Sequence, residues 1–277
     1  MRRDPWNDKV IWITGASSGI GRALALAWSQ AGAKLVISAR DATRLCQVQS
    51  ECRHPEDVRI IPLDLGELDT LPQQTREAHS AWGRVDVMVH CAGIALREPA
   101  VSTPLALDQK IMNVNYFGPM LITKLLLPEM LRQGAGHFVV LSSLSGRYGV
   151  PRLSAYAAAK HALHGYFESL RAETHAAGIR VTMVVPGFIR TPIVEHALTG
   201  SGVQYGRSLA AYQQGMDPAL CAEQILRGVL RQREEFAVGG WEVLTLCLHR
   251  MAPRLLSSLM RHHPVRLMRK LGMGRRA

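Results

Sequence analysis

Tyr156 and Lys160 form a pair with acid–base chemistry in the middle of the sequence. Only three alanines separate them, in a stretch with a helical pattern over residues 154–177. A spacing of four places a phenol and an ammonium on one face of a helix. Because a fixed cation favours the ionised phenol, whose ordinary pKa is about 10, Tyr156 can exchange a proton with a carbonyl or alcohol oxygen. Taken alone, such a pair is more often a chance product of an amphipathic helix.

Ser142 and Ser143 place hydroxyl groups at the end of an apolar run over residues 136–142, which we expect to be a strand. Open α/β sheets bind their ligands at the carboxyl ends of the strands. A serine hydroxyl there can orient and stabilise the oxygen that exchanges a proton with Tyr156. The sequence around Ser143 lacks the G-x-S-x-G turn of a hydrolase nucleophile, which argues against acyl transfer.

A glycine-rich turn with Gly15, Gly19 and Gly21 follows the first apolar run, Val10–Thr14, and opens a helical stretch over residues 19–31. Glycines at these points allow a tight turn and a close approach of the backbone to a diphosphate. The helix N-terminus offers free N–H donors to the anion. A structural loop with incidental glycines is the alternative, but the position in the first βα turn favours dinucleotide binding.

Arg40 stands at the end of the second expected strand, where an acidic residue would accept hydrogen bonds from the ribose hydroxyls of NAD(H). The end of this strand, Ser38-Ala39-Arg40, has no carboxylate before Asp41, and a guanidinium suits a phosphate. We therefore expect NADP(H) in preference to NAD(H). In the alternative reading, Asp41 caps the next helix and Arg40 is merely solvated.

The elements that must position these residues alternate between short apolar runs and longer helical patterns, which is typical of βαβ units and a parallel sheet. Several runs are apolar throughout, as in strands buried on both faces. We expect strands at residues 10–14, 34–39, 59–62, 85–90, 136–142, 180–185 and 236–238, and helices at residues 19–31, 42–53, 68–82, 105–133, 154–177 and 218–232.

The bulk composition fits one globular α/β domain of 277 residues, with 47% hydrophobic and 20% charged residues. Part of the net charge of +11 comes from a C-terminal stretch that has eight Arg or Lys and no acidic residue after residue 249. The five cysteines form no CxxC pair and favour a reducing compartment. With no signal-peptide pattern and no apolar run of about 18 residues, we expect a cytoplasmic protein.

From residue 9 to residue 238 the sequence resembles the short-chain dehydrogenase/reductases. The glycine turn has the TGxxxGxG form of that family, Ser143 precedes Tyr156 by the usual thirteen residues, and Tyr156 with Lys160 forms its YxxxK motif. Asn115 aligns with the asparagine that holds a proton-relay water near the lysine. The resemblance implies that Asn115, Ser143, Tyr156 and Lys160 are the catalytic set.

The same resemblance implies the fold and the cofactor contacts. It implies a single-domain Rossmann fold, with a doubly wound seven-stranded parallel sheet of order 3-2-1-4-5-6-7 and helices on both faces, assembled as a homodimer or homotetramer. Asp64 matches a position that contacts adenine, and the segment 186–191 matches one that meets the nicotinamide carboxamide. The expected cofactor-binding residues are Gly15, Ser17, Ser18, Gly19, Ile20, Gly21, Arg40, Asp64, Leu65, Ala92, Gly93, Tyr156, Lys160, Pro186, Gly187, Ile189 and Thr191.

His90 and Cys91 depart from the family pattern, which has two asparagines before the Ala-Gly pair. The second asparagine normally ties neighbouring strands together, and a thiol makes weaker hydrogen bonds. We expect a local perturbation at Cys91 that leaves the chemistry in place, and a structural or pocket-lining role for His90.

We divide the chain into a catalytic domain over residues 1–239 and a basic amphipathic extension over residues 240–277. The extension resembles the tails of membrane-associated members of the hydroxysteroid-dehydrogenase-like branch. Such a stretch can lie on an anionic membrane surface, cover a substrate pocket, pack on a neighbouring subunit or pack on its own domain. His249, His262, His263 and Cys247 lack a paired ligand motif, so we expect no metal site. No DNA-binding module is recognisable, so we expect no nucleic-acid partner.

These observations predict an oxidoreductase that interconverts a secondary alcohol and a ketone, or reduces an aldehyde, on an apolar substrate of medium size. The apolar character rests on Ile189, Ile193, Val194 and Leu198 in a lid-like stretch over residues 188–216, and on Tyr148 and Val150 in the loop over residues 144–153. The alternative is a cofactor-sensing module that keeps the fold and binds the nucleotide without turnover.

Overall fold

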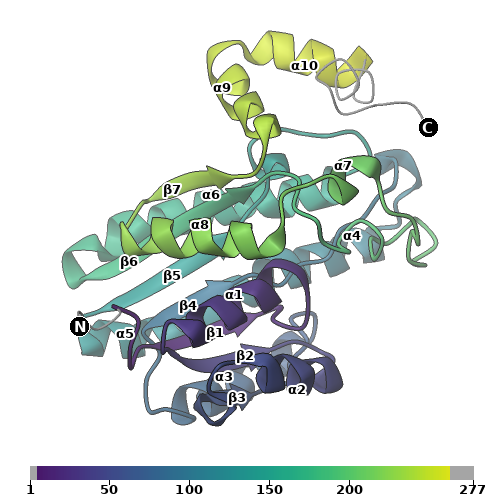
Figure 1. Cartoon of the computed structure of the whole chain (residues 1–277). Helices are drawn as coiled ribbons and strands as arrows, with labels where there is room; N and C mark the ends of the chain where they lie inside the picture. The colour runs from purple at the N-terminus through teal and green to yellow at the C-terminus, as the bar shows by residue number, and fades with distance from the viewer. Residues whose placement is uncertain (1–4, 263–277) are drawn as a thin grey trace.

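A seven-stranded parallel sheet forms the centre of the molecule, in a computed structural model that describes residues 5–262. The strand order is β3-β2-β1-β4-β5-β6-β7, which confirms the expected topology (Figure 1). The strands are β1 (Val10–Thr14), β2 (Lys34–Ser38), β3 (Val58–Ile60), β4 (Val87–His90), β5 (Gly136–Leu141), β6 (Ile179–Pro186) and β7 (Glu235–Val238).

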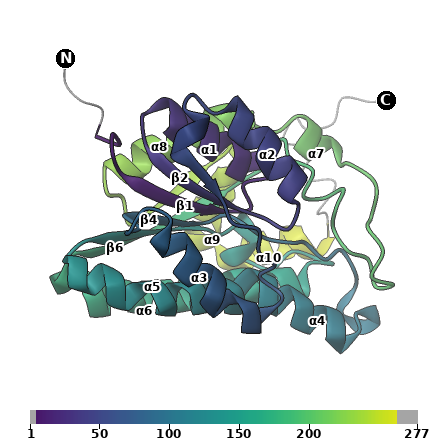
Figure 2. The same ribbon diagram turned by 90° about the horizontal axis from the view of Figure 1, so that it is seen from below.

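Helices cover both faces of this sheet, with α1, α2 and α8 on one face and α3, α5 and α6 on the other (Figure 2). The helices are α1 (Gly19–Gln30), α2 (Ala42–Glu51), α3 (Leu71–Ser80), α4 (Leu105–Met112), α5 (Gly118–Gln133), α6 (Ser154–Thr174), α7 (Ala210–Gln213), α8 (Pro218–Leu230), α9 (Leu244–Met251) and α10 (Pro253–His262).

The two faces of the sheet have separate hydrophobic cores because side chains alternate along a strand. In β1, Ile11 and Ile13 pack with Trp28 of α1, whereas Trp12 packs on the opposite face with Phe138 and Phe167. All six side chains are fully buried. A strand buried on both faces is therefore apolar along its whole length, as the sequence predicted for this run.

The order of the strands reverses between β1 and β4, and this reversal fixes the place of the functional site. β1 pairs with β2 on one side and with β4 on the other, so that Thr14 lies beside Ser38 and His90. The connections from these two central strands leave in opposite directions, which opens a crevice at their carboxyl ends.

The helix expected over residues 105–133 is interrupted, because α4 and α5 are joined by a π-helical turn at Asn113–Phe117. Such turns hold one extra residue and occur often at functional sites. Gly118, the first residue of α5, packs closely against the segment that follows β3. A Cβ at Gly118 would lie 2.8 Å from the carbonyl oxygen of Leu65. Asn115 in the turn is completely buried.

The C-terminal helices α9 and α10 project from the body of the domain, past the end of β7 (Figure 1). Among residues 5–262, no helix combines the length and the apolar character needed to span a bilayer. The expectations for His263 and for the last five basic residues of the sequence concern positions outside the described residues.

Candidate active site

A cleft of about 930 Å³ opens at the carboxyl edge of the sheet. The structure brings together there every residue that the sequence assigned to the cofactor, from Gly15 to Thr191. Three of the four predicted catalytic residues, Ser143, Tyr156 and Lys160, line the same cleft. The fourth, Asn115, lies behind its wall.

The glycine turn requires glycine at two points because the backbone packs on itself. A Cβ on Gly15, which has a φ of +72°, would lie 2.6 Å from the Cα of Ala92, and a Cβ on Gly21 would lie 2.2 Å from the carbonyl oxygen of Gly15. α1 begins at Gly19 and its N-terminus borders the cleft. The first N–H groups of a helix have no partner within it, so this end can receive a diphosphate.

Asn115 fixes the loop after β4 with two hydrogen bonds to one residue. Its Oδ1 accepts from the N–H of Ile94 at 3.0 Å, and its Nδ2 donates to the carbonyl oxygen of Ile94 at 2.8 Å. A Cβ on Gly93 would lie 2.8 Å from Oδ1 of Asn115 and 3.6 Å from Nζ of Lys160. Gly93 thus separates the asparagine from the lysine, and a larger residue would displace one of them.

Tyr156 and Lys160 are almost completely buried on α6. Nζ of Lys160 donates a hydrogen bond to the carbonyl oxygen of Leu141 at 2.8 Å. Burial lowers the pKa of Lys160 to about 8. Burial raises the pKa of Tyr156 to about 12, and a hydrogen bond with Ser143 opposes this rise. The sequence-based expectation of a lowered phenol pKa therefore does not hold in this structure, because burial outweighs the hydrogen bond with Ser143.

His90 and Cys91, the departures from the family pattern, have different surroundings. His90 is buried away from the cleft, with Nε2 at 2.8 Å from Oγ1 of Thr123 and its ring stacked on Phe138. Burial lowers its pKa to about 3, and its contacts with Thr123 and Phe138, outside the cleft, indicate a structural role. Cys91 lines the cleft, and the hydroxyl of Thr14 accepts a hydrogen bond from its N–H at 3.3 Å.

At the carboxyl ends of β2 and β3, Arg40 and Asp64 face each other at 4.0 Å. Asp41 caps α2, since its Oδ1 accepts from the N–H of Arg44 at 3.0 Å. Asp41 thus has the capping role of the alternative reading, while Arg40 still lines the cleft. Arg44, on the first turn of α2, was not predicted and also lines the cleft. The available signal was a second arginine four residues after Arg40.

Apolar side chains also line the cleft. Ile189, Ile193 and Leu198 line it as expected, together with Ile94 and Tyr212. Tyr212 lies on the short helix α7 and packs edge-on against Phe188, a contact that no local pattern reveals. Val194 is buried, and Tyr148 and Val150 line a separate cavity of about 680 Å³ beneath α10.

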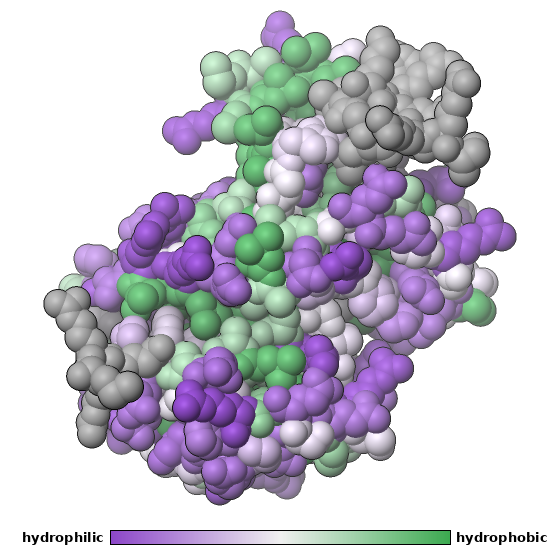
Figure 3. Space-filling model, in the orientation of Figure 1, coloured by the Kyte–Doolittle hydropathy of each residue, from purple (hydrophilic) through white to green (hydrophobic). Residues whose placement is uncertain are grey.

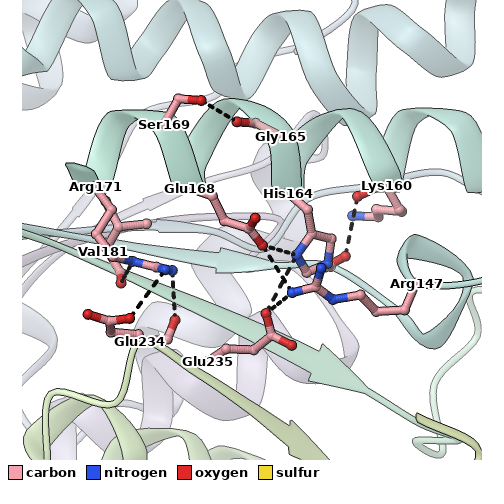
Figure 4. A network of polar contacts seen from close by, with 11 residues as sticks. Arg147, Lys160, His164, Gly165, Glu168, Ser169, Arg171, Val181, Glu234 and Glu235 are labelled. Carbon is pink, nitrogen blue, oxygen red and sulfur yellow. Dashed lines mark hydrogen bonds and ion pairs between the residues drawn. The ribbon is translucent and has the colours of Figure 1, made fainter. Parts of the chain in front are cut away.

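A network of charges lies one helical turn beyond Lys160 on α6 (Figure 4). The buried His164 faces Glu168 and Glu235, with its Nδ1 at 3.5 Å and 3.8 Å from their oxygens. These three residues have the spacing of metal ligands. Arg147, four residues after Ser143, pairs with both carboxylates. We therefore interpret the cluster as an ion network that attaches the segment after Ser143 to α6 and β7.

The fold and this cleft define a class, the Rossmann-fold oxidoreductases with a Ser-Tyr-Lys site. A family model described as short chain dehydrogenase matches residues 9–201. The chain therefore belongs to the short-chain dehydrogenase/reductase family and is an oxidoreductase of that family.

Similar proteins cover almost the whole chain. It is 37% identical to "Dehydrogenase/reductase SDR family protein 7-like" of Drosophila melanogaster, over 94% of this chain and 81% of that protein. A short-chain dehydrogenase from Streptomyces avermitilis shares 29% identity with a TM-score of 0.79, covering 96% of this chain and 99% of that one. A metagenomic short-chain oxidoreductase in complex with NADP shares 27% identity with a TM-score of 0.69, covering 84% and 97%.

Proposed function

We propose that the protein is an NADP(H)-dependent oxidoreductase that interconverts a secondary alcohol and a ketone, or reduces an aldehyde, on an apolar substrate of medium size. The observation that carries this proposal is that Ser143, Tyr156 and Lys160 line the same cleft as the glycine turn. A proton donor and a dinucleotide cradle are thus within one cavity.

The residues of the cleft fit a dinucleotide, because α1 begins at Gly19 beside the cleft and its first N–H groups can receive a diphosphate. A bound nicotinamide supplies or accepts the hydride. Tyr156 gives its proton to the carbonyl oxygen during reduction and takes one from the alcohol during oxidation. Ser143 holds that oxygen by a hydrogen bond, and the ammonium of Lys160 stabilises the phenolate that remains. Asn115 keeps the loop beside Lys160 in place.

The preference for NADP(H) is supported by the two guanidinium groups, Arg40 and Arg44, that line the adenosine end of the cleft. The carboxylate of Asp41 is engaged in capping α2 and in an ion pair with Arg44 at 3.3 Å. Arg40 remains 65% exposed at its side chain. A planar guanidinium that is accessible to ligand suits the 2′-phosphate of NADP(H).

Cofactor oxidation measured by absorbance tests this function. NADPH and NADH are each offered with aliphatic ketones, aldehydes and steroid ketones. Turnover of at least one carbonyl with NADPH preferred is the expected result. Tight NADPH binding with no turnover of any of these carbonyls would instead support a cofactor-sensing module.

We also propose that the protein assembles as a homodimer or homotetramer through α5 and α6. Leu131 near the end of α5 exposes 41% of its surface, and Phe117 just before this helix exposes 38%. Burial of apolar side chains drives association of subunits. Light scattering coupled to gel filtration would give a mass of two or four chains, and a monomer at micromolar concentration would exclude the assembly.

A peripheral contact with an anionic membrane surface is proposed for α9 and α10. Leu244, Met251 and Leu255 are exposed there, and hydrophobic side chains gather on this part of the molecule (Figure 3). Arg250 and Arg254 lie beside them, and residues 243–262 contain no Asp or Glu. Apolar side chains can enter the headgroup region while the arginines meet anionic lipids.

Flotation with phosphatidylserine-containing vesicles tests this contact. The wild type should float with these vesicles and not with neutral phosphatidylcholine, and Met251→Ser with Leu255→Ser should abolish flotation. Val101→Ser, at a 97% exposed position before α4 and away from α9 and α10, is the control. Equal flotation of all variants, or none, would exclude the proposed contact.

A further inference from the structure

Glu242 is a buried carboxylate just after β7, in a single 3-10 turn over Trp241–Val243. It is only 5% exposed. Its Oε1 accepts a hydrogen bond from the N–H of Phe188 at 2.8 Å and another from the N–H of Gly240 at 2.9 Å. Burial of an ionised carboxylate is unfavourable unless it is well bonded, and bonds from backbone N–H groups to a charge are strong. The position lies beyond the residues that the family model matches.

Three glycines converge on this carboxylate and leave no room for a side chain of their own. A Cβ on Gly187 would lie 2.2 Å from Oε1 of Glu242, and a Cβ on Gly239 would lie 2.7 Å from it. A Cβ on Gly240 would lie 2.8 Å from Oε2. A side chain at any of these positions would force the carboxylate to move, so Glu242 occupies space that the three glycines leave open.

The turn that Glu242 holds continues directly into the cleft. Pro186, Gly187, Ile189 and Thr191 line the cleft on either side of Phe188. Thr191 in turn abuts the glycine-rich turn, because a Cβ on Gly19 would lie 3.0 Å from its methyl group. A shift at Phe188 would therefore move the wall of the nicotinamide end of the site.

The residues after Glu242 also contact the segment that follows Ser143. The hydroxyl of Thr245 lies 2.7 Å from that of Tyr148, which is five residues after Ser143. The same hydroxyl donates to the carbonyl oxygen of Glu242. One short stretch of the C-terminal extension is thus bonded both to the segment 186–191 and to the loop that carries Ser143.

We propose that Glu242 is a positioning residue for the cofactor, holding the turn at Phe188 so that the segment 186–191 closes the nicotinamide end of the cleft. This inference rests on the proposed function, since it needs a nicotinamide nucleotide in the cleft. It makes cofactor affinity depend on the C-terminal extension, through a residue that touches no substrate atom.

The test compares three substitutions at Glu242 by fluorescence titration with NADPH and by thermal unfolding without cofactor. Glu242→Gln keeps the oxygen that accepts both hydrogen bonds, so its Kd for NADPH should stay within about threefold of wild type. Glu242→Ala removes the acceptor and Glu242→Asp shortens its reach by one methylene, so both should weaken NADPH binding about tenfold, which corresponds to about 1.4 kcal/mol. Glu223→Ala, at an exposed position on α8 paired with Arg227, is the matched control and should bind as wild type.

The outcomes separate a positioning role from a merely structural one. A structural role would lower the unfolding temperature of Glu242→Ala and Glu242→Asp and leave the Kd of the folded protein unchanged, and this would overturn the inference. If Glu242→Ala does not fold, Glu242→Asp against Glu242→Gln gives the same comparison. If wild type binds neither NADPH nor NADH, the proposed function fails as well. If wild type binds and turns over while the variants bind equally well, only the role of Glu242 is refuted.

Discussion

Nζ of Lys160 lies 5.8 Å from the centre of the Tyr156 ring, and both side chains are buried in the wall of the cleft. The ammonium is anchored to the carbonyl oxygen of Leu141, at the end of β5. Because burial raises the pKa of Tyr156 to about 12, the phenol carries its proton at neutral pH. The pair is thus arranged for proton donation, with the cation held in place to stabilise the phenolate that follows.

Tyr156→Phe removes the proton donor and should lower kcat for carbonyl reduction by about 10²–10⁴-fold, the usual range for a general acid. The Kd for NADPH should change by less than threefold, because the ring remains. Tyr166→Phe, on the same helix and outside the cleft, is the control. Full activity of the Tyr156 variant in a steady-state assay would disprove the mechanism.

The rate of reduction should fall as the pH rises through about 8. Burial lowers the pKa of Lys160 to about 8, so its ammonium is charged below this pH and loses its proton above it. Loss of the charge removes the stabilisation of the phenolate. A profile of kcat/KM between pH 6 and pH 10 reports the free enzyme. A rate that stayed constant or rose across pH 8 would contradict the role assigned to Lys160.

Cofactor preference should depend on Arg40 and Arg44. A hydrogen bond to a charged group contributes about 1.5–3 kcal/mol, so Arg40→Ser should weaken NADPH binding about tenfold or more while leaving NADH binding nearly unchanged. Adding Arg44→Ser should weaken it further. Arg207→Ser, on an exposed part of the lid-like stretch, controls for the general loss of positive charge. An unchanged ratio of the two affinities would remove the argument for NADP(H).

Acid should destabilise the fold through its buried histidines. Burial lowers the pKa of His90 to about 3 and that of His137 to about 4, whereas an unfolded histidine has a pKa of about 6.5. As the pH falls below about 6.5, a histidine of the unfolded chain binds a proton before the same histidine of the folded protein does. The stability that each neutral histidine contributes is therefore present above about pH 6.5 and is lost as the pH falls toward the folded pKa. Between pH 7 and pH 5, each of the two histidines should lower the free energy of unfolding by about 2 kcal/mol.

Urea unfolding of wild type and His137→Gln at these two pH values measures this loss. The variant should lose about 2 kcal/mol less than wild type, and the surface variant His54→Gln should behave as wild type. The same pH dependence in all three proteins would show that other groups control acid unfolding.

Local patterns in the sequence were sufficient for most of the fold. The all-apolar run in β1 predicted a strand buried on both faces, and the glycines at 15 and 21 predicted the tight turn that now packs against Ala92. The π-helical turn at Asn115 was not predictable, because it has the same apolar periodicity as the α-helices on either side. Contacts with Ile94, far away in the sequence, accompany it.

By itself, the sequence determined which chemical groups are present and the order of the elements that carry them, because periodicity and turn residues are local properties. Only the tertiary structure decided their electrostatics and their distant partners. The pKa of Tyr156 depends on how deeply its side chain on α6 is buried. Arg44 lines the cleft because the first turn of α2 lies beside it. Glu242 meets Phe188 across 54 residues, a contact that exists only once β6 and β7 are paired.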